Sequence, residues 1–266
     1  MSSFKVSTAS LMINVPVWFL LCSGPLKAQQ GTTPNIKHIV VGRCFNYITL
    51  VNSSLRIDCE EIWRQFEEAV VHQSSCNVTV DDYNHMFYAM PQTWPCDRFL
   101  FWSKTRTLMH SYAAVVPNYW TLEDTLVGSC PEWTACRNHP VYSLWRQASQ
   151  NFAEMACGNI TVLLNGSIVN AFSGKSMFGS VELDSLNACR VNYVNIKVVT
   201  NLDGPFIESC TKGSIVELIQ ILQARGFRWT CTDNEETLMI LQCILNPKQA
   251  SCQTCANSLS HIKSLT

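Results

Sequence analysis

Charge of either sign is scarce in this chain of 266 residues, of which only 15% are charged. The 19 Lys and Arg nearly balance the 20 Asp and Glu, so the net charge at pH 7 is −1. Such a balance provides no basic surface, and we expect neither a nucleic-acid partner nor attraction to an anionic membrane. Internal repeats and low-complexity segments are also lacking, which excludes repeat architectures and long disordered tracts.

Metal-ligand patterns are lacking as well. The six histidines have no ligand spacing, and the one C-x-x-C is formed by Cys252 and Cys255. A zinc site needs a second pair of ligands, and a redox motif needs a βαβ setting, so we interpret this pair as disulfide material. We therefore expect no metal and no bound cofactor.

Cysteine and apolar residues, by contrast, are abundant. The 14 cysteines are many for this length and indicate a disulfide framework. With 47% hydrophobic residues, the chain can bury a full core in one large domain or two small lobes. This content argues against a small growth-factor-like domain held together by disulfides alone.

The N-terminus has the pattern of a secretory signal peptide. Lys5 gives a weak positive charge, residues 11–22 are apolar, and Ala28 is a small residue at the expected cleavage site. An uncleaved membrane anchor is the alternative, although Asn14 and Pro16 interrupt the apolar run. We favour cleavage, and expect a membrane contact only if this segment is retained.

Four N-x-S/T triplets follow, the acceptor pattern for N-glycosylation in secreted proteins. They lie at Asn52, Asn77, Asn159 and Asn165. The last residues, 256–266, are polar and form no apolar tail for a lipid anchor. Together these features predict a secreted, soluble glycoprotein, with the cell surface or the lumen of a secretory vesicle as the alternative.

The front half of the chain is typical of helices. A helix is expected to begin near Asp58, because acidic residues crowd its first turn and apolar residues recur at helical spacing after it. A second helix is expected over 97–115. Thr121 and Asp124 have the spacing of an N-cap and the third residue of a further helical turn.

A longer helix is expected over 142–156, with Trp145 and Ser149 together beside its apolar stripe. After this helix the apolar pattern becomes that of strands, and Asn165-Gly166 is a strong hairpin signal. The expected elements are strands at 159–164, 167–172, 191–200 and 227–231, and a helix at 214–225 capped by Gly226.

The predicted fold class is α/β (α+β) in two lobes, both held by disulfides. The N-terminal lobe is rich in helices, and the C-terminal lobe has a small, mostly parallel sheet flanked by helices. A cleft between the lobes is the natural place for a site. The expected organisation is a signal peptide at 1–28, the helix-rich lobe at 29–158, the α/β lobe at 159–256 and a polar tail at 257–266.

A series of short motifs, in order and with the cysteine spacing preserved, extends over 42–252. They are Gly42-Arg43-Cys44, Leu100-Phe101-Trp102-Ser103, Thr121-Leu122-Glu123-Asp124-Thr125-Leu126, Ser129-Cys130-Pro131-Glu132-Trp133, Asn138-His139-Pro140 with Leu144-Trp145, Leu164-Asn165-Gly166-Ser167, Phe178-Gly179-Ser180-Val181-Glu182, Glu208-Ser209-Cys210 and Leu241-Gln242-Cys243. The ordered set resembles the ADP-ribosyl cyclase / NAD glycohydrolase family of ectoenzymes. No single motif decides the resemblance.

The resemblance implies an extracellular enzyme that cleaves the nicotinamide–ribose bond of NAD, with NADP as a second substrate and ADP-ribose or cyclic ADP-ribose as products. It places the catalytic glutamate at Glu182 and the residue that steers cyclisation against hydrolysis at Glu123. In substrate binding it assigns the two stacking tryptophans to Trp102 and Trp145, and the phosphate contacts to Ser103, Ser149 and Phe178. Two further substrate-binding positions, which vary within the family, are Lys104 and Met177.

The residue types suit this chemistry. Cleavage leaves an oxocarbenium-like cation on the ribose, which a carboxylate such as Glu182 stabilises or traps. Nicotinamide is a flat cation, to which indole faces offer stacking and cation–π attraction. Lys104 keeps the charge of the arginine often found at its position but loses the bidentate fork. Met177 stands where an aromatic residue accompanies cyclisation and a small polar one hydrolysis, and we expect hydrolysis as the main outcome.

The sequence departs from the family after Gly128, where a longer loop is usual. Because this loop borders the cleft, a secreted binding module on the same scaffold, with weak or no catalysis, is the alternative function. Retention of Glu182, Glu123 and both stacking tryptophans favours the enzyme.

The resemblance also implies a disulfide pattern. The pairs are Cys44–Cys59, Cys76–Cys136, Cys96–Cys157, Cys210–Cys231 and Cys243–Cys252. Cys22 leaves with the signal peptide, so Cys130, Cys189 and Cys255 remain. A Cys130–Cys189 bridge is favoured, and the last cysteine is either free or links two chains in a homodimer.

Overall fold

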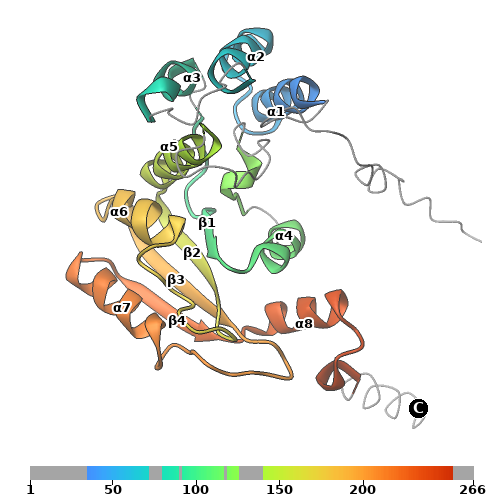
Figure 1. The fold of residues 1–266 in the computed structure, drawn as a ribbon, viewed down its shortest axis with the longest axis vertical. Coiled ribbons are helices and arrows are strands. Elements are labelled where there is room, and N and C mark those ends of the chain that lie inside the picture. The colour runs from blue at the N-terminus through green and yellow to red at the C-terminus, as the bar shows by residue number, and fades with distance from the viewer. Residues whose placement is uncertain (1–34, 72–79, 90–91, 117–118, 126–139, 254–266) are drawn as a thin grey trace, which may run out of the picture.

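The computed structural model describes residues 35–71, 80–89, 92–116, 119–125 and 140–253. Helices from the front of the chain gather at one end of the molecule, and a sheet with helices on both faces forms the other end (Figure 1). One apolar core runs through both parts, from Tyr47 and Phe66 in the helices to Val198 in the sheet and Leu222 behind it. The predicted α/β fold class is confirmed.

At the helical end of the molecule, the start of α2 is set by a capping residue that can be recognised in the sequence. Asp58 accepts hydrogen bonds from the main-chain N–H groups of Glu60 and Glu61, at 2.9 and 3.4 Å, so α2 begins where predicted. The Cys44–Cys59 disulfide holds α1 against α2. The elements are α1 (Ile36–Leu50), α2 (Cys59–Phe66), η1 (Glu67–Val71), η2 (Val80–Tyr83), α3 (Asn84–Ala89) and α5 (Pro140–Met155).

The other end contains a sheet of four described strands in which every neighbouring pair is parallel. The strands lie in the order of the chain, and helical segments carry the chain from one strand to the next. The strand predicted over 191–200 and the helix over 214–225 are confirmed, and the last strand begins later than predicted. The strands are β1 (Leu100–Ser103), β2 (Gly158–Asn165), β3 (Val191–Val199) and β4 (Trp229–Asp233), and helices on this part include α4 (Arg106–Val115), α6 (Leu183–Ser185), α7 (Ser214–Ala224) and α8 (Glu236–Leu245).

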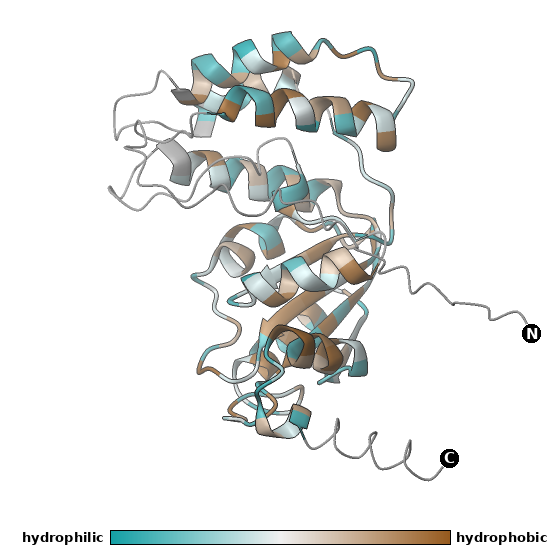
Figure 2. Ribbon diagram, turned by 90° about the vertical axis from the view of Figure 1, so that its right-hand side faces the viewer, coloured by the Kyte–Doolittle hydropathy of each residue, from teal (hydrophilic) through white to brown (hydrophobic). Residues whose placement is uncertain are grey.

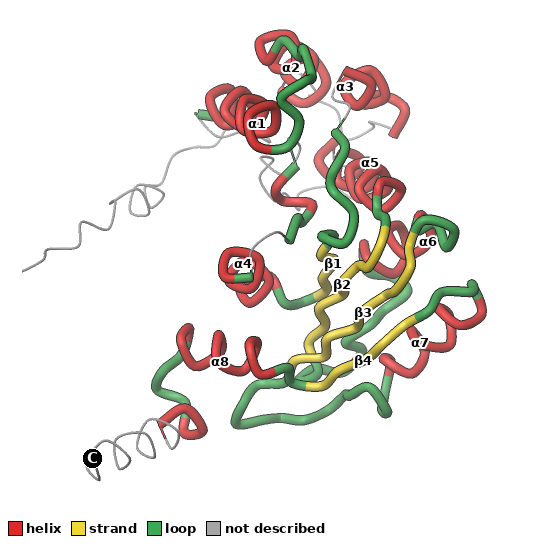
Figure 3. The backbone as a smooth tube through the Cα atoms, turned by 180° about the vertical axis from the view of Figure 1, so that it is seen from behind, coloured by secondary structure: helices red, strands yellow, loops and turns green. Residues whose placement is uncertain are grey.

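Helices cover both faces of the sheet (Figure 3). Leu163 of β2 belongs to the apolar layer beneath α4 and α8, whereas its neighbours Val162 and Leu164 belong to the layer beneath α7. The central strands are therefore apolar on both sides, and Figure 2 shows much of the sheet in the brown of hydrophobic residues.

The helix predicted over 97–115 is wrong in its first part, which forms β1, and only α4 is helical. Leu100 and Phe101 are both buried, and because adjacent strand residues point to opposite faces, the strand is covered on both faces. Such an apolar run has no period that separates it from a buried helix. Lys104, whose φ is 59°, turns the main chain between the end of β1 and the start of α4.

The hairpin predicted at Asn165-Gly166 is wrong. No strand forms over 167–172, because β2 is already paired with β1 on one side and β3 on the other. The chain leaves the sheet instead. Gly166 is needed there, since a Cβ would lie 2.7 Å from the main-chain oxygen of Glu208.

Four of the expected disulfides are present and confirmed: Cys44–Cys59, Cys96–Cys157, Cys210–Cys231 and Cys243–Cys252. The expected Cys76–Cys136 pair lies outside the described residues, as do Cys130 and Cys255. Cys189 is exposed and free, so the favoured bridge from Cys130 to Cys189 is wrong.

The predicted glycosylation sites fall in different surroundings. Asn159 is exposed, Asn52 and Asn165 are half-buried, and Asn77 lies outside the described residues. No helix in the described ranges is both long and apolar enough to cross a membrane. The segment expected to be a signal peptide precedes residue 35 and is outside these ranges.

Candidate active site

Glu182 ends a π-helical turn, η5 (Phe178–Glu182), which leads directly into α6. The Ser176 hydroxyl starts the turn: it donates to the main-chain oxygen of Ser173 at 2.7 Å and accepts from the Gly179 N–H at 3.1 Å. Gly179 is required, because a Cβ there would collide with the Ser173 main chain. π turns are rare and occur frequently at functional sites.

The Glu182 carboxyl group is withdrawn from water, with 7% of the residue exposed. Burial raises its pKa from 4.5 to about 8; the nearby Ser149 hydroxyl acts to lower this pKa, and the Glu123 carboxylate acts to raise it. Without a ligand, this carboxyl group is therefore largely protonated at neutral pH. A cation placed beside it would favour the ionised form.

Helix α5 packs against η5 and carries two of the predicted substrate-binding residues. The Ser149 hydroxyl is buried and close enough to Glu182 to affect its pKa, yet it makes no hydrogen bond of standard geometry among the described residues. A buried hydroxyl without a partner marks a position that a ligand group or a water can complete. Trp145, half-buried, lies one turn earlier on the same face of α5.

Trp102 and Glu123 are joined directly. The Trp102 indole Nε1 donates to the two carboxylate oxygens of Glu123 at 3.1 and 3.3 Å. Glu123 lies in η3 (Leu122–Asp124), which begins with the predicted capping box of Thr121 and Asp124. An indole fixed through its edge can offer a face to a flat ring.

Arg43 of α1 reaches the same turn from the helical end of the molecule. Its guanidinium group donates to the main-chain oxygens of Glu123 and Thr125, the latter at 2.6 Å. Sequence reasoning assigned Arg43 no role. The residue lies 80 positions before Glu123, and no local pattern links the two.

Phe178, Ser103 and Met177 lie close to these groups in the chain but differ in exposure. The Phe178 ring is buried, with its centroid 6.2 Å from those of Phe101 and Phe172, so its side chain belongs to the core. A ligand contact from this residue can come only from its main chain. Ser103 is buried at the end of β1, and Met177 is half-buried just before η5.

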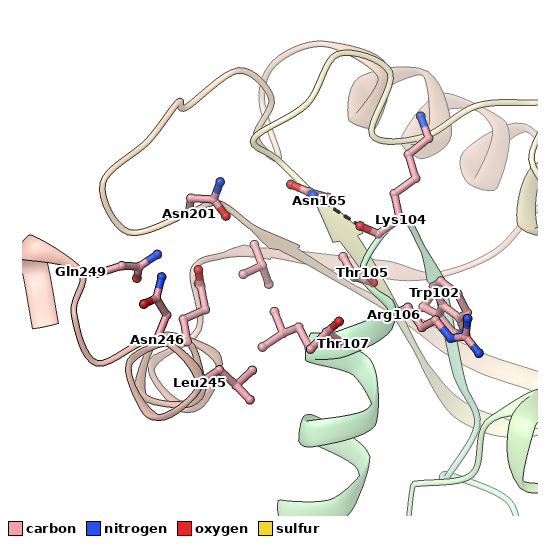
Figure 4. Close-up of a pocket in the computed structure, with 13 residues that line it drawn as sticks. Trp102, Lys104, Thr105, Arg106, Thr107, Asn165, Asn201, Leu245, Asn246 and Gln249 are labelled. Carbon is pink, nitrogen blue, oxygen red and sulfur yellow. Dashed lines mark hydrogen bonds between the residues drawn. The ribbon is translucent and has the colours of Figure 1, made fainter. Parts of the chain in front are cut away.

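A pocket of about 390 Å³ opens beside Trp102, at the carboxyl ends of β1, β2 and β3 (Figure 4). Its lining is rich in amide side chains, which are Asn165, Asn201, Gln242, Asn246 and Gln249. Lys104 also lines it, but Lys104 points away from these amides and donates to the main-chain oxygen of Asn170 at 2.8 Å. Glu182 is not part of this lining.

The site thus combines two carboxyl groups, an indole held by one of them and a buried hydroxyl without a partner. This set suits a flat, cationic group with hydroxyls nearby. In the described ranges, no cluster of His, Cys, Asp and Glu is arranged to hold a metal ion.

The sequence matches the ADP-ribosyl cyclase family over residues 33–129 and 128–252. The two matched segments meet at the position where the family's longer loop is expected to be missing. Among curated proteins, the chain is 36% identical to ADP-ribosyl cyclase/cyclic ADP-ribose hydrolase 1 of Mus musculus, over 84% of this chain and 81% of the mouse protein. It is 29% identical to the enzyme of Aplysia kurodai, over 83% and 87% of the two chains.

Solved structures agree with this match. Aplysia cyclase complexed with substrate NGD and product cGDPR has a TM-score of 0.73 and 28% identity, covering 83% of this chain and 97% of that one. Porcine CD38 complexed with a covalent intermediate, ribo-F-ribose-5'-phosphate, has a TM-score of 0.69 and 34% identity, covering 77% and 97%. The sequence match, the fold and these relatives show that the chain belongs to the ADP-ribosyl cyclase family.

Proposed function

We propose that this protein consumes NAD, and NADP as a second substrate, by cleaving the bond between nicotinamide and ribose. The observation that carries the proposal is the buried Glu182 carboxyl group, with the Glu123 carboxylate and the buried Ser149 hydroxyl beside it. A buried acidic group beside a second, half-buried carboxylate is costly to the fold and is typical of a site that meets a cation. The ligands of the Aplysia and porcine structures support a nucleotide substrate and a covalent step.

In the proposed reaction, Trp102 and Trp145 stack on the nicotinamide ring and Glu182 faces the anomeric carbon of the ribose. The glycosidic bond breaks, its electron pair moves to the nicotinamide nitrogen, and neutral nicotinamide leaves. The carboxylate of Glu182 stabilises the resulting ribose cation or bonds to it as an ester. Attack by water gives ADP-ribose and a proton, whereas attack by the adenine ring gives cyclic ADP-ribose.

The remaining groups bind the rest of the nucleotide in this proposal. The hydroxyls of Ser103 and Ser149 and the main-chain N–H of Phe178 donate to the diphosphate. Lys104 contributes its charge after leaving the Asn170 oxygen. Met177 is flexible and apolar, so we propose that hydrolysis to ADP-ribose is the main outcome.

The disulfides and the family indicate an extracellular or cell-surface location. We propose that the protein is secreted after loss of residues 1–28 and is glycosylated. An uncleaved N-terminal anchor is the alternative, and detection of the chain in the medium or in the membrane fraction distinguishes the two.

The experiment is to incubate the secreted chain with NAD and to separate nicotinamide, ADP-ribose and cyclic ADP-ribose by chromatography. Glu182→Gln should abolish nicotinamide release. Asp184→Asn, which removes an exposed carboxylate from α6, is the matched control and should keep it. If the wild type is folded and releases no nicotinamide, the enzyme proposal fails and a binding module on this scaffold takes its place.

A further inference from the structure

The turn that carries Glu123 is very short, and its two ends are held differently. η3 has three residues, and its first end is closed by the capping box of Thr121 and Asp124. A single 3₁₀ turn has few hydrogen bonds of its own and poor geometry in them. At its last end the Thr125 hydroxyl donates to the Leu122 oxygen at 2.7 Å, and two further bonds come from outside the turn.

The outside contact is Arg43. One guanidinium nitrogen donates to the main-chain oxygens of both Glu123 and Thr125, and so bridges the residue before and the residue after Asp124. A planar guanidinium suits such a double contact, and a lysine ammonium lacks its fixed geometry. The main chain at Arg43 is also held in place, because the next residue, Cys44, forms a disulfide with Cys59 of α2.

A displacement of the Glu123 main chain would reach the rest of the site through two interactions of its side chain. The Glu123 carboxylate accepts the Trp102 N–H, and the same carboxylate acts on Glu182 through its charge. Small displacements of groups in an active site have large effects on rate and on the partition of an intermediate. The contacts of Arg43 with the main chain of Glu123 and Thr125 give it a route to Trp102 and Glu182 through Glu123.

We infer that Arg43 is a positioning residue that fixes Glu123 against Trp102, and that it thereby controls how the ribose cation is divided between cyclisation and hydrolysis. The first part concerns geometry alone. The second part rests on the function proposed above.

The test compares Arg43→Met, Arg43→Lys and Arg190→Met. Arg190 is the matched control, because its guanidinium also donates to two main-chain oxygens, those of Glu154 and Met155, at 2.7 and 3.2 Å. With NAD as substrate, Arg43→Met should change the ratio of cyclic to linear product by about threefold to tenfold. Arg43→Lys should change it less, and Arg190→Met should leave it unchanged.

A double variant separates positioning from general loosening of the fold. In a Glu123→Gln background, Arg43→Met should have little further effect on the product ratio, because the side chain through which it acts is already altered. Added guanidinium chloride at low concentration should restore part of the wild-type ratio to Arg43→Met alone. An equal effect in both backgrounds, or no rescue, would overturn the role in product control.

A spectroscopic measurement tests the geometry without requiring any activity. In protein labelled with ¹⁵N-tryptophan, the Trp102 indole N–H resonance, assigned with Trp102→Phe, reports the bond to Glu123. Arg43→Met should shift this resonance, and Arg190→Met should not. An unchanged resonance in Arg43→Met would overturn the positioning role, whereas a shifted resonance in a protein without NAD cleavage would refute only the proposed function.

Discussion

Glu182→Gln is expected to stabilise the folded protein in alkaline solution, besides abolishing nicotinamide release. In the folded state the Glu182 carboxyl group keeps its proton up to about pH 8, whereas in the unfolded chain it ionises near 4.5. Between these values the folded state binds one more proton than the unfolded state. The free energy of unfolding of the wild type therefore falls as pH rises through this window.

The size of the effect follows from the width of the window. A raised pKa costs about 1.4 kcal/mol for each pH unit, so burial of the ionised Glu182 costs on the order of 5 kcal/mol above pH 8. A neutral glutamine of nearly the same shape does not titrate and avoids this cost. The variant should thus match the wild type near pH 4.5 and exceed it by several kcal/mol at about pH 9.

The assay is denaturation by urea, with disulfides intact, at a series of pH values from about 5 to about 9. The quantity of interest is the difference in free energy of unfolding between Glu182→Gln and wild type, plotted against pH. Asp184→Asn, at an exposed carboxylate, is the control and should show no comparable rise. A difference for Glu182→Gln that stays constant over the whole range would refute the reasoning from burial.

Three further predictions concern the reaction and the scaffold. The kcat/KM for nicotinamide release should rise with pH and level off above about 8, because the ionised form of Glu182 is needed, and Glu123→Gln should move the inflection to lower pH; a flat profile would contradict this. Glu208→Ala should lower the free energy of unfolding by about 3 kcal/mol, because the buried Glu208 carboxylate accepts from several main-chain N–H groups that would lose their partner. Urea denaturation measures this loss of stability, and a change below about 1 kcal/mol would show that water replaces the carboxylate. Removing the Cys96–Cys157 disulfide, which closes a loop over a separation of 61 residues, should cost about 4 kcal/mol; retention of the wild-type melting temperature in the Cys→Ser double variant would contradict the estimate.

Local chemistry explains why parts of the fold could be predicted from the sequence. The Asp58 cap and the Thr121–Asp124 box are contacts between residues a few positions apart, so the spacing of polar and acidic residues encodes them. The amphipathic helix α7, which ends before Gly226 at φ 77°, is encoded in the same way. The disulfide pairs and the candidate site residues came from the family resemblance instead.

Contacts between distant segments explain what could not be predicted. The strand β1 was missed because Leu100 and Phe101 are buried on opposite faces of a sheet that no local pattern reveals. The hairpin at Asn165 failed because β1 and β3 occupy both edges of β2. The role of Arg43 depends on a turn 80 residues away, and the raised pKa of Glu182 depends on the depth at which the whole fold buries it.

The order of the strands has a consequence for folding during synthesis. Because β1, β2, β3 and β4 are neighbours in the order of synthesis, a nascent chain can extend the sheet at one edge, without inserting a late strand between two earlier ones. Until β4 emerges, β3 is an unpaired edge, and its residues Val194, Ile196 and Val198 are all buried in the finished fold. Such an edge is prone to association with other chains. Synthesis of β4 therefore covers this edge of β3, and oxidation of Cys231 with Cys210 then ties β4 to the rest of the fold.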